Sequence, residues 1–362
     1  MNRDQFIQRI IPQSIIESAA YQVVDSTGMI KLDAMENPYS WPDSLRSSLA
    51  NRLAACELNR YPDPSARAVR TSIKSWMKIP NALSVLFGNG SDEIIALLIS
   101  SLIGSGRSVC APDPSFVMFK VLAKQFRVPF HALPLDEEMD LDTGQWIEGL
   151  NSNDAGIVFV PQPNNPTGNL FTDDRLRAVV ESTDALVVID EAYTAFTDAD
   201  YMDWAEKYPN VLIMRTLSKI GLAGSRFGLL IGAPEWISEY DKLRLPYNIN
   251  TLSQAAVVFA LEHSEILEEQ SAAIRSERQR LTLELGHRNV KVWPSEANFI
   301  LVEMPKGRAF EIFEGLKSVN ILVKCLDGVH PALADTLRIT VGIPCESDAM
   351  LMVLDQLLDT GR

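Results

Sequence analysis

The sequence predicts an α/β protein in which a large domain, built on a doubly wound and mostly parallel sheet, precedes a smaller α+β domain. Two observations favour this architecture. Short, continuously apolar runs alternate with amphipathic helical stretches, which is typical of parallel strands buried on both faces. After about Tyr247 the pattern changes to long, charged helical stretches with few strands, which indicates a second unit.

The chain begins with a segment, residues 1–40, that mixes short apolar stretches with polar breaks and is expected to form an N-terminal arm. The large domain is expected over 41–247. It opens with a helix at about 43–55, and a turn made rigid by Pro62 and Pro64 follows. Its strands are expected at 84–87, 108–111, 156–160, 185–189, 211–214 and 227–231.

The smaller domain is expected over 248–362 and begins with one long helical pattern at about 252–285. Strand-like and helical segments then alternate over shorter distances. The expected elements are strands at 290–293 and 298–303, a helix near 310–316, strands near 321–323 and 337–341, and a last helix from about residue 348.

Composition and charge restrict the function classes. The chain has 33 Lys and Arg against 47 Asp and Glu, a net charge of −14, and no basic block, which argues against nucleic-acid binding. Four cysteines without a C-x-x-C pair are typical of a reducing compartment, and four scattered histidines predict no metal site. Without a signal segment or a long apolar run, we expect a cytoplasmic protein that does not contact membranes.

Polar residues follow five of the predicted strands, at the edge where doubly wound sheets bind ligands. The glycine turn at 88–92 precedes a helix, so its free amides could hold a phosphate, although an ordinary capped turn has the same pattern. Asp190 and Glu191 at a strand end fit a solvated end, a metal ligand or the partner of a cationic ring equally well.

Lys219 follows another apolar strand. Burial there would lower the pKa of its amine and make the amine a nucleophile toward a carbonyl group, whereas a solvated lysine would have no such role. Arg226 and Arg338 could each grip an anion through two parallel hydrogen bonds. The residues alone therefore predict an anion-binding site with a lysine and a carboxylate.

Several motifs together resemble the fold-type I pyridoxal-phosphate-dependent aminotransferases. They are Asn-Asn-Pro-Thr-Gly at 164–168, Asp-Glu-Ala-Tyr at 190–193, Arg-Thr-Leu-Ser-Lys at 215–219 and Gly-Leu-Ala-Gly-Ser-Arg at 221–226. Within that family the chain looks most like the histidinol-phosphate branch. The supporting strings are Glu-Asn-Pro-Tyr at 36–39, Tyr-Pro-Asp at 61–63, Gly-Asn-Gly-Ser-Asp-Glu at 88–93, Ala-Asn-Phe at 297–299 and Leu-Arg-Ile-Thr-Val-Gly at 337–342.

The resemblance implies pyridoxal 5'-phosphate as cofactor and catalytic roles for three residues. Lys219 would bond covalently to the cofactor and move a proton, and Asp190 would keep the pyridine nitrogen protonated. Tyr193 would form a hydrogen bond to the oxygen on the cofactor ring. It also implies a homodimer with shared active sites. The expected cofactor contacts are Gly90, Ser91, Asp92, Phe116, Asn165, Asp190, Tyr193, Ser218, Lys219, Arg226 and, from the neighbouring subunit, Tyr61.

For the substrate, the resemblance implies contacts from Arg338, Lys324, Tyr21, Tyr247 and Asn165. Lys324 stands where many relatives have a second phosphate-binding arginine, which keeps the charge but loses the planar grip. The expected reaction exchanges an amino group between L-histidinol phosphate and 2-oxoglutarate in histidine biosynthesis. The alternatives are transamination of aromatic amino acids and decarboxylation of threonine phosphate on the same scaffold.

Overall fold

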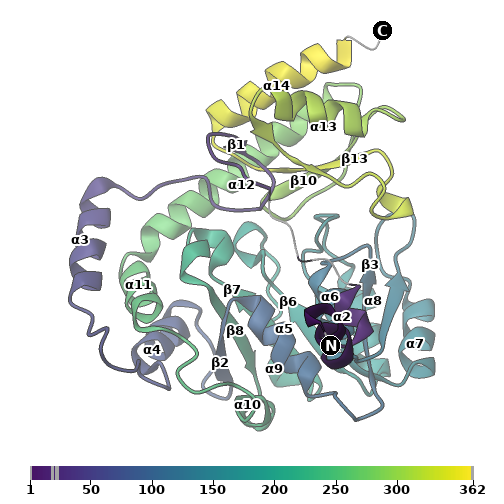
Figure 1. Ribbon diagram of the computed structural model, residues 1–362. Helices are drawn as coiled ribbons and strands as arrows, with labels where there is room; N and C mark the ends of the chain where they lie inside the picture. Colours follow the sequence, from purple (N-terminus) through teal and green to yellow (C-terminus); the bar gives the residue numbers. More distant parts are fainter. Residues whose placement is uncertain (1, 18–19, 21–23, 360–362) are drawn as a thin grey trace.

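A computed structural model of the protein describes residues 2–17, 20 and 24–359. The chain forms two units, a large one around a seven-stranded sheet and a smaller one that carries the C-terminus, at the top of Figure 1. The long helix α12 (Ser264–Gly286) runs between them.

The large sheet has the strand order β2-β8-β7-β6-β5-β3-β4. Only β8 runs antiparallel to its neighbours, so the sheet is mixed but mostly parallel, as predicted. The polar strand ends of β3, β5, β6 and β7 therefore meet at one edge. The strands are β2 (Ser84–Asn89), β3 (Ser108–Asp113), β4 (Phe130–Pro134), β5 (Ala155–Pro161), β6 (Leu186–Asp190), β7 (Val211–Thr216) and β8 (Phe227–Gly232).

Successive residues of the central strands pack into two different cores, which explains their continuously apolar sequences. In β6, Val187 and Ile189 lie in one core, whereas Leu186 and Val188 lie in the core on the opposite face. Helices cover both faces. The first core receives α4 (Arg67–Trp76), α7 (Thr143–Ser152), α8 (Asp173–Ser182) and α11 (Thr251–Glu262), and the second receives α5 (Ser91–Ser100), α6 (Met118–Phe126) and α10 (Pro234–Asp241).

The smaller unit has its own core around a four-stranded antiparallel sheet of order β12-β13-β10-β9 and a two-stranded parallel pair of β1 and β11. Because β1 pairs with β11, part of the predicted N-terminal arm belongs to this unit. The elements are β1 (Ile30–Lys31), β9 (Lys291–Val292), β10 (Phe299–Glu303), α13 (Ala309–Ser318), β11 (Ile321–Leu322), β12 (Lys324–Cys325), β13 (Thr336–Thr340) and α14 (Pro344–Asp359).

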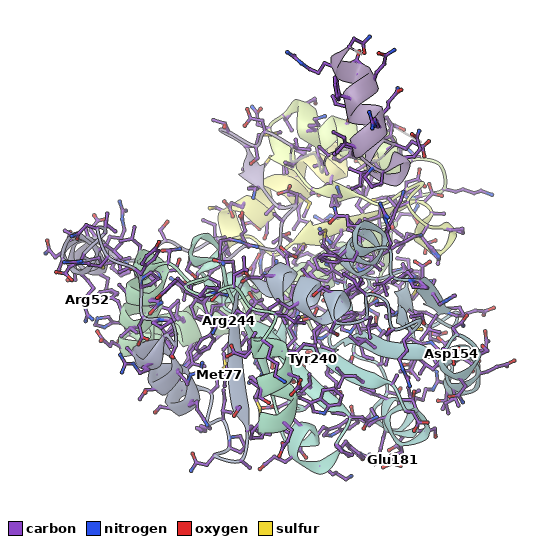
Figure 2. All side chains as sticks on the ribbon, turned by 60° about the horizontal axis from the view of Figure 1, so that its bottom comes forward. Arg52, Met77, Asp154, Glu181, Tyr240 and Arg244 are labelled. Atoms are coloured by element: carbon purple, nitrogen blue, oxygen red, sulfur yellow. The ribbon has the colours of Figure 1, made fainter. Side chains whose placement is uncertain are left out.

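The expected single helix over 252–285 is wrong in one respect. The chain leaves the helical conformation at His263 (φ −128°, ψ 38°), so α11 and α12 are separate helices. Val257 and Ala260 of α11 pack in the core of the large sheet, although this helix lies beyond the predicted boundary at residue 247. The helix α3 (Asp43–Ala54) is held on α11 by the ion pair of Arg52, at the left of Figure 2, with Glu262 (2.6 Å).

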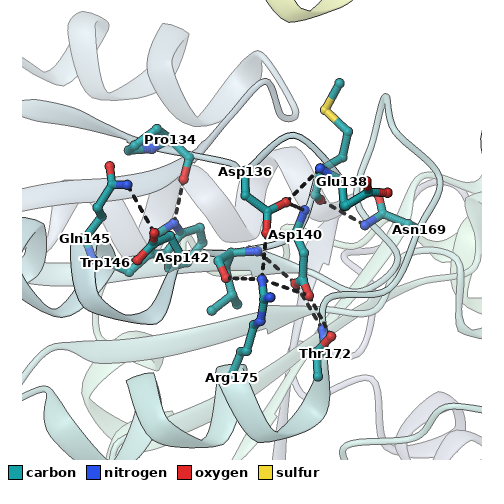
Figure 3. A network of polar contacts seen from close by, with 12 residues as sticks. Pro134, Asp136, Glu138, Asp140, Asp142, Gln145, Trp146, Asn169, Thr172 and Arg175 are labelled. Atoms are coloured by element: carbon teal, nitrogen blue, oxygen red, sulfur yellow. Dashed lines mark hydrogen bonds and ion pairs between the residues drawn. The ribbon is translucent and has the colours of Figure 1, made fainter.

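Polar networks fix the loops between elements. After β4, the carboxylates of Asp136 and Asp140 both pair with Arg175 of α8, at 2.7 and 3.3 Å (Figure 3). At the other end of the chain, the helices α1 (Arg3–Ile10) and α2 (Gln13–Ile16) precede the body of the molecule, and α1 buries none of its residues. Among the described residues, no helix is long and apolar enough to cross a bilayer.

Candidate active site

One cavity lies beyond the carboxyl ends of the parallel strands, where the sequence predicts the ligand site. The residues that line it come from five connections of the large sheet and from the segment before α3. Nine of the predicted site residues meet there, namely Ser91, Asp92, Phe116, Asn165, Asp190, Tyr193, Ser218, Lys219 and Arg226.

The two adjacent carboxylates at the end of β6 have different surroundings. Asp190 lines the cavity, and its Oδ1 accepts a hydrogen bond from the Ala192 amide (3.1 Å). Glu191 instead points away and pairs with the buried Arg215 at 2.7 Å. Burial raises the pKa of Asp190 to about 7, against the opposing effects of the Ala192 amide and the Lys219 ammonium. Only Asp190 is therefore available to a ligand.

Lys219 stands in the short helix after β7 and shares the cavity with Asp190. Burial, and after it the charge of the nearby Arg338 guanidinium, together lower the pKa of its amine to about 8, although Glu36, Asp92 and Asp190 oppose the shift. Lys219 Nζ lies 5.7 Å from the centre of the Tyr193 ring. A substantial share of the amine is therefore neutral near physiological pH, which a nucleophile or a base requires.

Arg338 connects the smaller unit to this cavity. It lies on β13, and its Nη1 donates to Asn165 Oδ1 (2.5 Å) while its Nη2 donates to the carbonyl of Asp33 (2.8 Å). Asn165 is also hydrogen-bonded to Tyr193, a buried side chain whose pKa is raised by desolvation. These contacts link a guanidinium, an amide and a phenol, of which the amide and the phenol line the cavity.

The part of the cavity lining formed by Ser91, Asp92 and Arg226 has the features of an anion site. Gly90 (φ +78°) is the N-cap of α5, and Arg226 Nη2 lies 3.0 Å from Asp92 Oδ2 in the first turn of that helix. A β-carbon at Gly90 would lie 2.6 Å from Arg226 Nη2, and one at Gly228 would lie 2.4 Å from the Gly90 carbonyl carbon. Gly90 thus lets the helix start approach the guanidinium, and Gly228 lets it lie close against β8. Free amides beside a cation suit a phosphate.

Among the described residues, Tyr61, Tyr247 and Lys324 were predicted to contact cofactor or substrate but do not line the cavity. Tyr61 is 81% exposed and stacks on Tyr247, with ring centres 4.6 Å apart, outside the cavity lining. Lys324 is exposed on β12, opposite Arg338 in register. Tyr21 lies outside the described residues.

The sequence reasoning missed a network that supports the helix start. Glu93 Oε2 accepts hydrogen bonds from the backbone amide of Asn89 (2.5 Å) and from Asn248 Nδ2 (3.0 Å). Asn89 Nδ2 in turn donates to the carbonyl of Asn248 (2.7 Å). The only sequence signal was a glutamate at the third position of the helix, where a side chain can reach back to amides before the helix.

Comparison with known proteins assigns the chain to a class and then to a group of relatives. The family model for aminotransferase class I and II matches residues 27–354, and the chain belongs to this family. A curated relative from Nitrosococcus oceani, "Histidinol-phosphate aminotransferase 2", is 42% identical over 357 residues, which cover 98% of each chain. The histidinol-phosphate aminotransferase of Chromobacterium violaceum is 40% identical and covers 97% of this chain and 98% of its own.

Solved structures agree with the fold. The histidinol-phosphate aminotransferase of Sinorhizobium meliloti, solved in complex with pyridoxal-5'-phosphate, has a TM-score of 0.87 and 22% identity, and the match covers 98% of this chain and 99% of the other. The enzyme of Clostridium acetobutylicum has a TM-score of 0.83 at 24% identity, covering 92% and 100%. The described part of the chain contains no group of three His, Cys, Asp or Glu side chains placed to hold a metal ion.

Proposed function

We propose that this protein is a pyridoxal-phosphate-dependent aminotransferase that exchanges an amino group between L-histidinol phosphate and 2-oxoglutarate, in histidine biosynthesis. The observation that carries the proposal is the buried pair of Asp190 and Lys219 in one cavity with an anion-binding helix start. The relatives that are about 40% identical over almost the whole chain support the substrate.

The residues present fit pyridoxal phosphate. The amides at the start of α5, Ser218 and Arg226 would hold the phosphate, and Phe116 would lie against the ring. Asp190, which burial makes costly to ionise, gains a cationic partner if its carboxylate meets a protonated ring nitrogen. When bound, the cofactor supplies a carbonyl that takes up the amino group and a ring that accepts electron density.

The chain's own residues then position the substrate and move one proton. Lys219, with a pKa of about 8, can take the proton from the substrate Cα and release it again near neutral pH. Arg338, held by Asn165 and the Asp33 carbonyl, presents a fixed cation for the carboxylate of glutamate or the phosphate of the other substrate. A single cation that accepts either anion lets both substrates use one cavity in turn.

We also propose that the enzyme is a cytoplasmic homodimer in which Tyr61 contributes to the partner's site. Tyr61 and Tyr247 stack on each other at the surface, and Leu58 and Leu245, close to them in the sequence, are also exposed. Exposed apolar patches mark protein contacts, and a second copy would cover these side chains. Sedimentation should give twice the mass of one chain, and replacement of both leucines by lysine should shift the enzyme toward monomer.

An absorbance titration tests the function. Protein loaded with pyridoxal phosphate should lose its visible cofactor band on addition of L-histidinol phosphate and recover it with 2-oxoglutarate. Lys219→Ala should abolish this response, and Lys242→Ala, a change at an exposed lysine paired with Glu239, should leave it intact. A response to L-phenylalanine alone would replace the proposed substrate, release of CO2 from threonine phosphate would replace the reaction, and a protein that binds no cofactor would overturn the whole proposal.

A further inference from the structure

The active-site cavity is lined mostly by polar side chains. Apart from two prolines, Ala192 and the catalytic Tyr193, its apolar lining consists of the side chains of Met35 and Phe116. Phe116 comes from the large unit, at the end of β3, and the proposed function assigns it to the cofactor ring. Met35 comes from the segment between β1 and α3 and has no role so far.

Met35 lies in the middle of a strap, residues 33–37, that crosses from the smaller unit to the loop of the catalytic lysine. Its amide donates to Thr340 Oγ1 (3.0 Å), and its carbonyl accepts from Asn298 Nδ2 (3.0 Å). Farther along the strap, Asn37 Nδ2 donates to the carbonyl of Ile220, next to Lys219 (3.2 Å). The backbone of Met35 is therefore held on both sides, and the direction of its side chain is determined.

The neighbouring polar side chains of the strap are engaged elsewhere. Glu36 pairs with Lys31 at 2.5 Å, and Asn37 donates to Gln270 Oε1 at 2.9 Å. Met35 is the strap residue that lines the cavity, and its side chain is 8% exposed. It also packs in the apolar core of the smaller unit. The strap thus presents a single thioether side chain to whatever occupies the cavity beside Lys219.

We propose that Met35 is a specificity-determining residue whose side chain packs against the ring of a ring-bearing amino donor. The inference rests on the proposed function, in which a substrate with a heteroaromatic ring and the ring-free glutamate use the cavity in turn. Thioether sulfur makes favourable contacts with aromatic rings, and the unbranched methionine side chain also adapts to an aliphatic substrate. Met35 therefore favours the ring-bearing donor without excluding glutamate.

Backbone conformation supplies a matched control. Met35 has a positive φ of +52°, which is uncommon for a long side chain. Met139 has the same features, with φ +60° and only 5% exposure, but it lies between Asp136 and Asp140 in sequence and does not line the active-site cavity. A methionine with a positive φ is therefore not by itself a sign that the residue belongs to the active site. Replacing either methionine by alanine keeps the backbone strain and removes an equivalent buried side chain.

The experiment compares kcat/KM for L-histidinol phosphate and for L-glutamate in the pyridoxal-phosphate-loaded enzyme and three variants. Met35→Ala should lower the value for histidinol phosphate about fivefold to tenfold, mainly through KM, and change the value for glutamate less than about twofold. Met35→Leu, which keeps apolar bulk without sulfur, should be intermediate. Met139→Ala should leave the ratio of the two values unchanged.

If Met35→Ala leaves the ratio of kcat/KM for histidinol phosphate to kcat/KM for glutamate unchanged, whether both values fall equally or neither falls, Met35 does not have this role. Failure of the proposed function has a different signature, because wild-type enzyme would then not turn over histidinol phosphate at all. In that case the ratio is measured with L-phenylalanine as the ring-bearing donor, and the same outcomes decide. A wild-type enzyme that uses no ring-bearing donor refutes both.

Discussion

Replacing Lys219 by methionine is expected to stabilise the cofactor-free protein at pH 8, because the native fold holds this amine at a cost. Burial and the charge of Arg338 lower the pKa of Lys219 from 10.5 to about 8. Each unit of difference between the folded and unfolded pKa corresponds to roughly 1.4 kcal/mol. The protonated amine therefore destabilises the native state by about 3 kcal/mol, and methionine, which has a similar length and no charge, removes this penalty.

The sign of the pH dependence follows from proton binding. Below pH 8 the amine is protonated in both states, so the full penalty applies. Between about 8 and 10.5 the folded protein has lost the proton while the unfolded chain still binds it, so wild-type stability rises with pH. Above 10.5 neither state is protonated and the penalty vanishes. The advantage of the variant is thus largest at or below pH 8.

Urea unfolding of cofactor-free wild type and Lys219→Met, at one protein concentration, measures this difference at pH 8 and pH 10.5. The variant should be more stable by about 2 to 3 kcal/mol at pH 8, and the difference should fall below about 1 kcal/mol at pH 10.5. Lys242→Met, at an exposed lysine, should differ from wild type by less than about 0.5 kcal/mol at both pH values. A Lys219→Met difference that is absent at pH 8, or that does not shrink at high pH, refutes the reasoning.

Two further predictions concern the support of the helix start. Gly228→Ala places a methyl group 2.4 Å from the Gly90 carbonyl carbon, so we expect affinity for pyridoxal phosphate to fall by about tenfold or more and stability to fall by about 1–3 kcal/mol, measured by cofactor titration and urea unfolding. Glu93→Ala removes the acceptor that Asn89 and Asn248 share, so the dissociation constant of the cofactor should rise, whereas Glu93→Gln, which keeps one acceptor oxygen, should restore part of the affinity. Equal affinities of both Glu93 variants and wild type would contradict this role.

Local sequence determined the elements whose burial is uniform along the chain. The central strands β5, β6 and β7 were predicted to within two residues at each end, because a strand buried on both faces must be apolar throughout. The edge strand β4 escaped prediction, since most of its residues are only partly buried or exposed and it carries His131 and Pro134. A strand with one bonded edge and little burial leaves no apolar run in the sequence.

The sequence also determined that Asp190 and Lys219 meet in one cavity, because the motifs around them follow strands whose ends must meet at one edge of a parallel sheet. Only the tertiary structure decided how distant segments complete the site. Glu93 bonds to Asn248, and Met35 is held between Asn298 and Thr340, contacts that join residues more than a hundred positions apart. No local sequence pattern predicts such pairs, because the local structure around each residue can form whether or not its distant partner is present. They arise because packing of the two units brings the segments together, and it is this packing that gives the cavity its apolar wall and its fixed guanidinium.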